Sequence, residues 1–307
     1  MSEGQTRRDF VGGVLLGGVA AALAPMSEAK GEDPPAPAPR PEASWKNRPW
    51  VHPSEILASI SPRKKKIFVV SYVGQPVPGG KALDGTFADC EASIEGGADA
   101  VILINENMPE DKKKTQFPPM SELEEAVKEC RKKFPDLKLG ANWLGDEKDD
   151  LYGYKGGFRL AKENNLCLVW TDVSGIDLIK EAPALSLHEI AAARPAGVFY
   201  CSGIHMKYTH LLDEKKTIEE SALQAMGWLD GIIVTGPKTG KASDPEVVKR
   251  TRKVIGSYPL GVASGVTAEN VGAIKEHVDF YIVHTGIQEK HRISAAKVKA
   301  LRQALDN

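Results

Sequence analysis

The chain has 307 residues, of which 42% are hydrophobic and 26% are charged, so it can bury a full hydrophobic core. A formal net charge of -1 gives no electrostatic basis for binding nucleic acid, and no nucleic-acid partner is expected. The four cysteines form no Cys-x-x-Cys pair, which argues against a zinc or redox motif, and buried apolar positions are expected for Cys90, Cys130, Cys167 and Cys201.

The N-terminus has the order of an export signal. Thr6-Arg7-Arg8-Asp9-Phe10 precedes an uncharged stretch, residues 11–24, that is rich in Gly and Ala. This order is typical of a twin-arginine signal, and the stretch is shorter than the about 20 apolar residues of a membrane-spanning helix. We therefore expect a signal peptide over residues 1–29 and a periplasmic or other extracytoplasmic location. An uncleaved signal that acts as an anchor is the alternative.

A proline-rich stretch follows the signal and favours extended backbone, so residues 30–60 are predicted to form a linker. From there on, short apolar runs alternate with helical patterns, which places one domain at residues 61–307. The predicted strands are Ile67–Val73, Ala100–Asn105, Lys138–Trp143, Cys167–Thr171, Gly197–Cys201, Gly231–Thr235, Leu260–Ala263 and Phe280–His284.

Most of these runs are continuously apolar, as in parallel strands that are buried on both faces. Between them, Ser121 is expected to cap one helix, Thr217 with Glu220 to cap another, and residues 294–305 to form the last helix. The fold class is therefore predicted to be α/β, a (β/α)8 TIM barrel. An open doubly wound sheet is the rival, but no G-x-G-x-x-G follows the first strand.

Function in such a barrel lies at the C-terminal ends of the strands. Glu106 follows strand two, Asp146 follows strand three, and Lys207 follows strand five. We expect these three as catalytic residues, because a lysine can neutralise an oxyanion or act as a base, and a carboxylate can carry a proton. Each also has a structural interpretation, as a loop charge or a helix cap.

The last three predicted strands each end in Gly with Ser or Thr, and glycine lets backbone N–H groups approach an anion closely. Thr267 is expected to cap the helix after strand seven. A small phosphorylated molecule is therefore the predicted partner. The predicted ligand-binding residues are Asn142, His205, Thr235, Gly236, Thr239, Gly240, Ser264, Gly265, Thr285 and Gly286.

No metal triad is evident in the sequence, and no cofactor is predicted, although Glu106, Asp146 and a phosphate could share Mg²⁺. A homo-oligomer is compatible with the sequence.

Several segments resemble motifs of the BtpA family of TIM-barrel proteins, over about residues 67–305. The similar segments are Asn105-Glu-Asn, Asn142-Trp-Leu-Gly-Asp146, His205-Met-Lys207, Asp230-Gly-Ile-Ile-Val-Thr-Gly and Ser264-Gly-Val-Thr-Ala-Glu-Asn. The resemblance implies a barrel like those that bind ribulose phosphate, and a link to biogenesis of photosystem I.

The chain departs from the family pattern in three places: Ser71-Tyr-Val-Gly after strand one, His284-Thr-Gly after strand eight, and Tyr208 after the lysine. We therefore keep two functions open. The first is an exported protein that binds or acts on a small phosphorylated ligand, and the second is a non-catalytic assembly factor for an envelope or membrane complex. An exported solute-binding or lectin-like protein is a third, weaker alternative.

Overall fold

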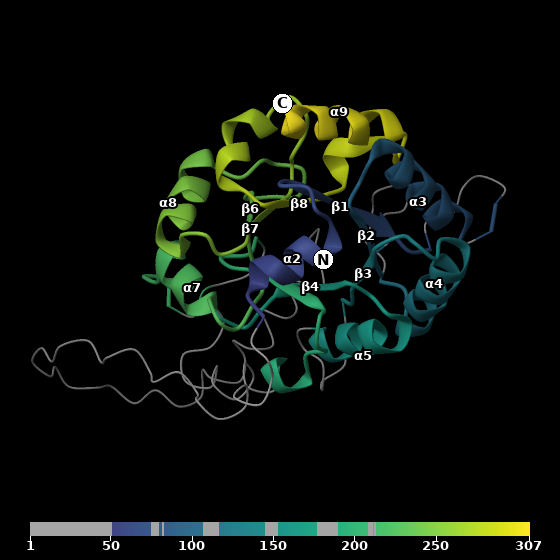
Figure 1. Cartoon of the computed structure of the whole chain (residues 1–307), viewed down its shortest axis with the longest axis horizontal. Coiled ribbons are helices and arrows are strands. Elements are labelled where there is room, and N and C mark those ends of the chain that lie inside the picture. The colour runs from purple at the N-terminus through teal and green to yellow at the C-terminus, as the bar shows by residue number, and fades with distance from the viewer. Residues whose placement is uncertain are drawn as a thin grey trace, which may run out of the picture.

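A computed structural model describes residues 51–74, 80–81, 83–106, 117–144, 153–176, 190–207, 211 and 213–307. The predicted signal peptide, most of the predicted linker and Asp146 lie outside these residues. The described chain forms a closed barrel of eight parallel strands in sequential order, with helices around it (Figure 1). The strands are β1 (Lys66–Tyr72), β2 (Ala100–Ile104), β3 (Leu139–Asn142), β4 (Leu168–Val173), β5 (Phe199–Gly203), β6 (Gly231–Thr235), β7 (Leu260–Ala263) and β8 (Phe280–Val283).

The predicted TIM barrel is thus confirmed, and each predicted strand overlaps an observed one. The helices lie outside the barrel, and a short hairpin follows β8. The helices are α3 (Asp84–Gly96), α4 (Met120–Lys133), α5 (Tyr154–Asn164), α7 (Ile218–Ala225), α8 (Pro245–Ile255) and α9 (Ala295–Asp306), and the hairpin is β9 (Gln288–Glu289) with β10 (Arg292–Ile293).

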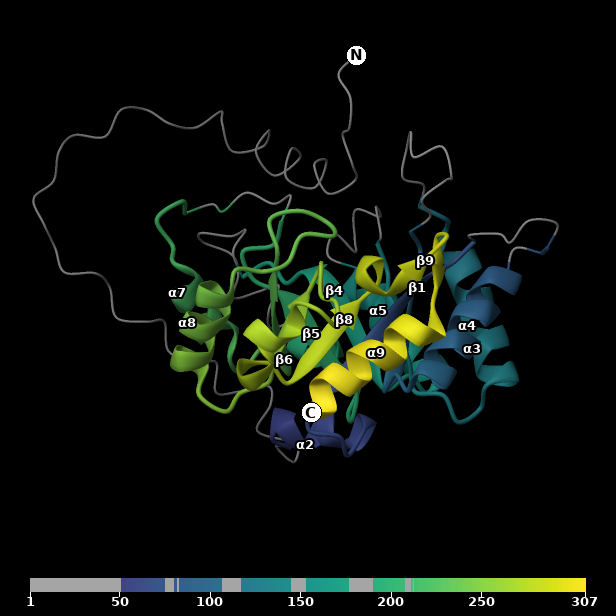
Figure 2. The same cartoon turned by 90° about the horizontal axis from the view of Figure 1, so that it is seen from above.

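Residues 53–60, which we expected in the linker, form helix α2 (Pro53–Ile60). Pro53 stands in the first turn, where its missing N–H costs nothing, and His52 accepts a hydrogen bond from the Ser54 N–H. The buried side chains of Ile56, Leu57 and Ile60 join the cluster inside the barrel. Helix α2 therefore closes the N-terminal end of the barrel, while β9 lies toward the other end (Figure 2).

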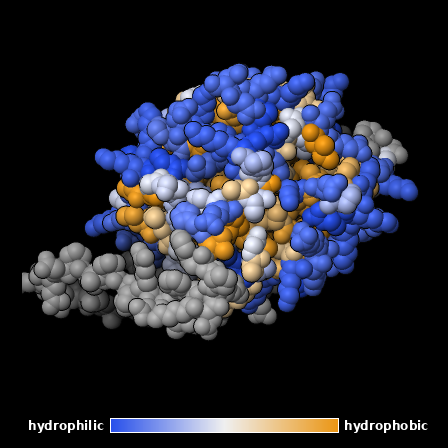
Figure 3. All heavy atoms as spheres, in the orientation of Figure 1, coloured by the Kyte–Doolittle hydropathy of each residue, from blue (hydrophilic) through white to orange (hydrophobic). Residues whose placement is uncertain are grey.

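Two hydrophobic layers follow from the alternation of side chains along each strand. One face of each strand fills the barrel, and the other packs against the helices. Inside, large residues oppose glycines, since a Cβ on Gly231 or Gly261 would lie within 2.9 Å of the Phe280 ring. On the outer surface at the α2 end, hydrophilic residues predominate at the edge and apolar ones lie mainly toward the middle (Figure 3).

Buried and half-buried ion pairs hold the N-terminal ends of the strands together. Three aspartates that directly precede even-numbered strands each accept a backbone N–H from the strand before and an arginine side chain. These are Asp99 with Ile67 N and Arg302, Asp230 with Tyr200 N and Arg194, and Asp279 with Leu260 N and Arg252. Asp230, the first residue of the glycine-rich run of the sequence, therefore has a structural role far from the strands' C-terminal ends.

Candidate functional site at the C-terminal mouth

The alternation of the strands decides which polar side chains face the inside of the barrel mouth. Trp170 and Ile233 belong to the interior cluster, so Asp172 and Thr235, two residues further along the same strands, point to the same side. The same parity places Asn142 of β3 and, beyond β2, Glu106 on the inner side. The mouth is therefore lined by polar groups above an apolar interior, as in a small-molecule site.

Asn142 and Asp172 form the centre of one wall. The Asn142 amide donates a 3.2 Å hydrogen bond to the Asp172 carboxylate, and both side chains are buried. The pairing of β4 with β5 shifts register between Thr171 and Val173, at the position of Asp172. The fourth predicted strand ends at Thr171, and Asp172 is not among the predicted site residues. The tertiary structure adds it.

Lys207 and Ser264 meet across the loops that follow β5 and β7. The Lys207 ammonium donates a short hydrogen bond to the Ser264 hydroxyl. Ser264 has φ +80° and Gly265 has φ +63°, so two successive residues adopt the left-handed conformation. This conformation is costly for serine and is found most often at turns and binding sites. A hydroxyl and a cation from two loops thus meet beside two left-handed residues.

The loops after β6, β7 and β8 pack closely on one another through glycines. A Cβ on Gly236 would lie 1.9 Å from the Lys241 carbonyl oxygen, and a Cβ on Gly265 would lie 2.3 Å from the Lys241 carbonyl carbon. A Cβ on Gly286 would lie 2.1 Å from the Val266 carbonyl oxygen. Gly236, Gly265 and Gly286 are therefore required for loop packing, besides any role at a ligand.

The remaining predicted residues of these loops lie near the surface. Thr239, Gly240 and Thr285 are exposed, and a Cβ on Gly240 would lie 3.6 Å from the Thr285 methyl group. The ends of the β6 and β8 loops are therefore neighbours at the rim of the mouth.

Asn270 shapes the loop after β7. Its side chain accepts from the Thr267 N–H at 2.9 Å and donates to the Gly265 carbonyl at 2.7 Å. The expected helix at this point is replaced by two short 3₁₀ turns, η1 (Val271–Ala273) and η2 (Lys275–His277). Thr267 therefore caps no α-helix, and the positive potential expected from a helix N-terminus is not provided by this segment.

His284 is held in one tautomer at the end of β8. Its Nδ1 lies 2.8 Å from the Val70 carbonyl oxygen, which can only accept, so Nδ1 carries the proton. Its Nε2 then accepts from the Gln288 amide at 2.8 Å. Tyr72 stacks on the ring with centroids 3.9 Å apart, and burial lowers the pKa of His284 to about 4. His284 is therefore neutral near pH 7.

The hairpin after β8 is anchored by Asp89 of α3. The Arg292 guanidinium donates two 3.1 Å hydrogen bonds to the Asp89 carboxylate, and the Ile293 N–H donates a third. Burial raises the pKa of Asp89, while the charge of Arg292 opposes this shift. This anchor holds the segment that carries Gln288, and through Gln288 it orients His284.

His205 and Glu106 complete the predicted set. His205 has φ +43°, and its Nε2 lies 3.1 Å from the Ser221 hydroxyl of α7, so the ring is directed toward that helix. Glu106 is half-buried beyond the end of β2. The neighbouring Asn105 binds the backbone of Pro118 and Leu144 and so fixes the segments that follow β2 and β3.

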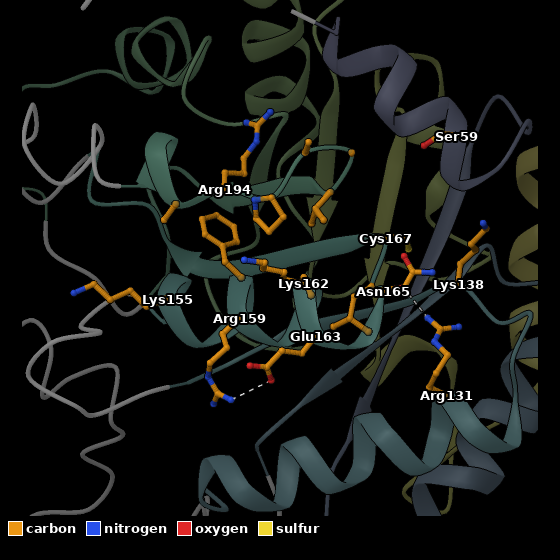
Figure 4. Close-up of a pocket in the computed structure, with 18 of the residues that line it drawn as sticks. Ser59, Arg131, Lys138, Lys155, Arg159, Lys162, Glu163, Asn165, Cys167 and Arg194 are labelled. Carbon is orange, nitrogen blue, oxygen red and sulfur yellow. Dashed lines mark hydrogen bonds and ion pairs between the residues drawn. The ribbon is translucent and has the colours of Figure 1, made fainter. Parts of the chain in front are cut away.

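A separate hollow of about 1440 Å³ lies on the flank of the barrel, between α5 and the segment before β5 (Figure 4). No predicted site residue is among its described lining residues. Its arginines are engaged in the fold: Arg159 pairs with Glu124 and Glu163, and Arg194 pairs with Asp230. The mouth, rather than this hollow, is therefore the candidate site.

Within the described part of the chain, no group of three or more His, Cys, Asp or Glu side chains is arranged to hold a metal ion. Over the same residues, no helix is long and apolar enough to cross a bilayer.

Comparison with known proteins decides the family. The model of the BtpA family matches residues 80–306. The chain belongs to the BtpA family. It is 27% identical to an uncharacterized protein of Pyrococcus horikoshii, over 69% of this chain and 80% of that protein. An uncharacterized protein of Methanocaldococcus jannaschii is 25% identical over 74% of this chain and 88% of its own length.

Solved structures share the fold of this BtpA-family protein. The tryptophan synthase alpha chain of Legionella pneumophila gives a TM-score of 0.54 at 15% identity, covering 83% of this chain and 97% of that one. (S)-3-O-geranylgeranylglyceryl phosphate synthase of Thermoplasma acidophilum was solved with its substrate sn-glycerol-1-phosphate. It gives a TM-score of 0.54 at 12% identity, covering 82% of this chain and 97% of that one. At these identities the similarity shows the barrel fold alone.

Proposed function

We propose that this BtpA-family protein binds a small phosphorylated molecule at the C-terminal mouth of its barrel. The observation that carries the proposal is the contact of Lys207 with Ser264, beside two successive left-handed residues. A phosphate bound beside this pair would accept hydrogen bonds from the ammonium, the hydroxyl and backbone N–H groups. The loops after strands seven and eight are the usual phosphate site of this fold.

The fold comparison supports the ligand class. The synthase of Thermoplasma acidophilum has the same architecture and was solved with a glycerol phosphate. The opposite wall of the mouth carries the carboxylates of Asp172 and Glu106, which are suited to proton transfer on the unphosphorylated part of a ligand. Lys207 would then hold the phosphate, and Asp172 or Glu106 would move a proton if the protein is an enzyme.

The test measures binding of inorganic phosphate and phosphorylated metabolites to the full chain. Thermal unfolding and titration calorimetry are the two readouts. A ligand that binds only the native state raises the unfolding midpoint. Two matched variants probe the loop, because both Asp and Asn tolerate the left-handed conformation of Ser264. Ser264→Asp places a negative charge beside the phosphate and should abolish binding, whereas Ser264→Asn should retain it in part.

If neither phosphate nor any phosphorylated compound shifts the midpoint, the proposed function is wrong. An equal response of the Asp and Asn variants would also contradict a phosphate at this loop.

We also propose export through the twin-arginine signal of residues 1–29, which is supported by Arg7, Arg8 and the uncharged stretch that follows them. The ligand site would then be assembled before export, since this route carries folded proteins.

A further inference from the structure

Three buried polar atoms on the inner wall of the barrel have no hydrogen-bond partner among the described residues. They are Asn142 Oδ1, Trp170 Nε1 and Thr235 Oγ1. Asn142 is 0% exposed and Trp170 is 7% exposed. Buried polar groups are nearly always paired, so unpaired ones on the inner wall of the barrel are candidates for groups that a ligand would satisfy.

The three atoms belong to β3, β4 and β6, of which β3 and β4 are neighbours while β5 separates β4 from β6. Trp170 precedes Asp172 by two residues on β4 and faces the same side, while Asn142 bonds to Asp172 from β3. Thr235 ends β6, next to β7, which leads directly into Ser264 and Gly265. The interior of an eight-stranded barrel is only wide enough for side chains or one small ligand. A molecule held by phosphate at Ser264 would therefore extend over these atoms.

The hydrogen-bonding character of the wall is mixed. Asn142 Oδ1 can only accept, Trp170 Nε1 can only donate, and the Thr235 hydroxyl can do both. An alkyl group would leave all three unpaired, and a carboxylate would lie beside the carboxylate of Asp172. Hydroxyl groups donate and accept at once, so they match the wall without adding charge.

We propose that the unphosphorylated part of the ligand is a polyol, bound by Asn142, Trp170 and Thr235 beneath the phosphate loops. This inference rests on the proposed function and deepens it to one substrate class, the polyol or sugar phosphates. Asn142 accepts from one hydroxyl, Trp170 donates to another, and Thr235 bonds to a third hydroxyl of the polyol.

The experiment compares three compounds by calorimetry on the full chain: inorganic phosphate, pentyl phosphate and ribitol 5-phosphate. The last two have the same chain length and differ in their hydroxyl groups. Each neutral hydrogen bond contributes roughly a 3- to 10-fold change in Kd. Ribitol 5-phosphate is therefore expected to bind at least about 10-fold more tightly than pentyl phosphate.

Two variants locate the effect. Thr235→Val keeps the side-chain shape and removes the hydroxyl, and Trp170→Phe removes the indole N–H. Each variant should weaken the binding of ribitol 5-phosphate by roughly 3- to 10-fold and leave the Kd of inorganic phosphate unchanged. Thr86→Val is the matched control, because the Thr86 hydroxyl is also buried without a partner in the described structure but lies on α3. It should change neither Kd.

The outcomes separate the two proposals. If pentyl phosphate binds as tightly as ribitol 5-phosphate, the polyol inference is overturned and phosphate binding stands. Loss of affinity for inorganic phosphate in Thr235→Val would likewise overturn the assignment of Thr235 to the polyol. If none of the three compounds binds, both proposals fall.

Discussion

The Lys207 ammonium donates a hydrogen bond to the Ser264 hydroxyl, and this contact joins the loops after β5 and β7. The two residues are 57 positions apart in the chain. Ser264 adopts a left-handed backbone at this contact, which a serine rarely does without a compensating interaction. The pair therefore links an unusual backbone to a cation at the place where the barrel binds phosphate in our proposal.

Lys207→Met keeps a long side chain and removes the charge. Because hydrogen bonds to charged groups are worth about 1.5–3 kcal/mol, we expect phosphate to bind roughly 10- to 100-fold more weakly. Calorimetry at two salt concentrations is the measurement. Lys299→Met, at an exposed position on α9, is the control and should leave the Kd unchanged. Equal affinity of the wild type and Lys207→Met would exclude Lys207 from the phosphate site.

His284 should make stability depend on pH. Burial lowers its pKa from 6.5 to about 4, so between these values the unfolded chain binds a proton that the folded protein does not. Stability should be complete above about pH 6.5 and decline as the pH falls toward 4, by at most about 3 kcal/mol. Urea unfolding at several pH values measures this.

In His284→Asn this part of the pH dependence should disappear. The control is His291→Asn, because His291 is exposed and its left-handed φ of 63° suits Asn. An unchanged slope in His284→Asn would show that other groups cause the acid sensitivity.

Asp99→Ala should strongly destabilise the fold without affecting the mouth. Asp99 accepts from Ile67 N, Ser61 and two arginines at the N-terminal end of the barrel, and the buried Arg302 would lose its buried carboxylate partner and keep only the exposed Asp306. Removing one partner of such a pair costs about 3–5 kcal/mol. Chemical denaturation tests this, and phosphate affinity below the unfolding midpoint should be unaltered.

Asp306→Ala is the matched control, because Asp306 also pairs with Arg302 but its side chain is 56% exposed. Exposed pairs contribute about 0–1 kcal/mol. Equal losses in the two variants would refute the importance of burial at Asp99.

Replacement of Arg7 and Arg8 by lysine should stop export of the chain. A reporter fused to residues 1–60 should reach the extracytoplasmic side with the native signal and stay in the cytoplasm with the lysine pair. The control replaces Arg40 and Arg48, within the predicted linker, by lysine. This is the same substitution at two other arginines, and it should not affect export. Export of the lysine pair at the native level would contradict the twin-arginine assignment.

Much of the fold was predictable because its determinants are local. Continuous β-branched runs identified the strands, and the capping box of Thr217 with Glu220 is observed as expected. Local patterns also misled at three points. The helix α4 is capped at Pro119 rather than Ser121, no α-helix follows Thr267, and residues 53–60 form a helix. For α2, the packing of its apolar side chains under the barrel outweighed the local preference for an extended linker.

The amino-acid order alone determined the barrel, the number of its strands and the end at which the candidate site lies, because alternation and apolar runs are properties of neighbouring residues. Only the tertiary structure brought Lys207 to Ser264, turned His205 toward α7, and added Asp172 and Trp170 to the inner wall. These relationships join residues from different strands, loops and helices, and closure of the barrel decides which side chains meet.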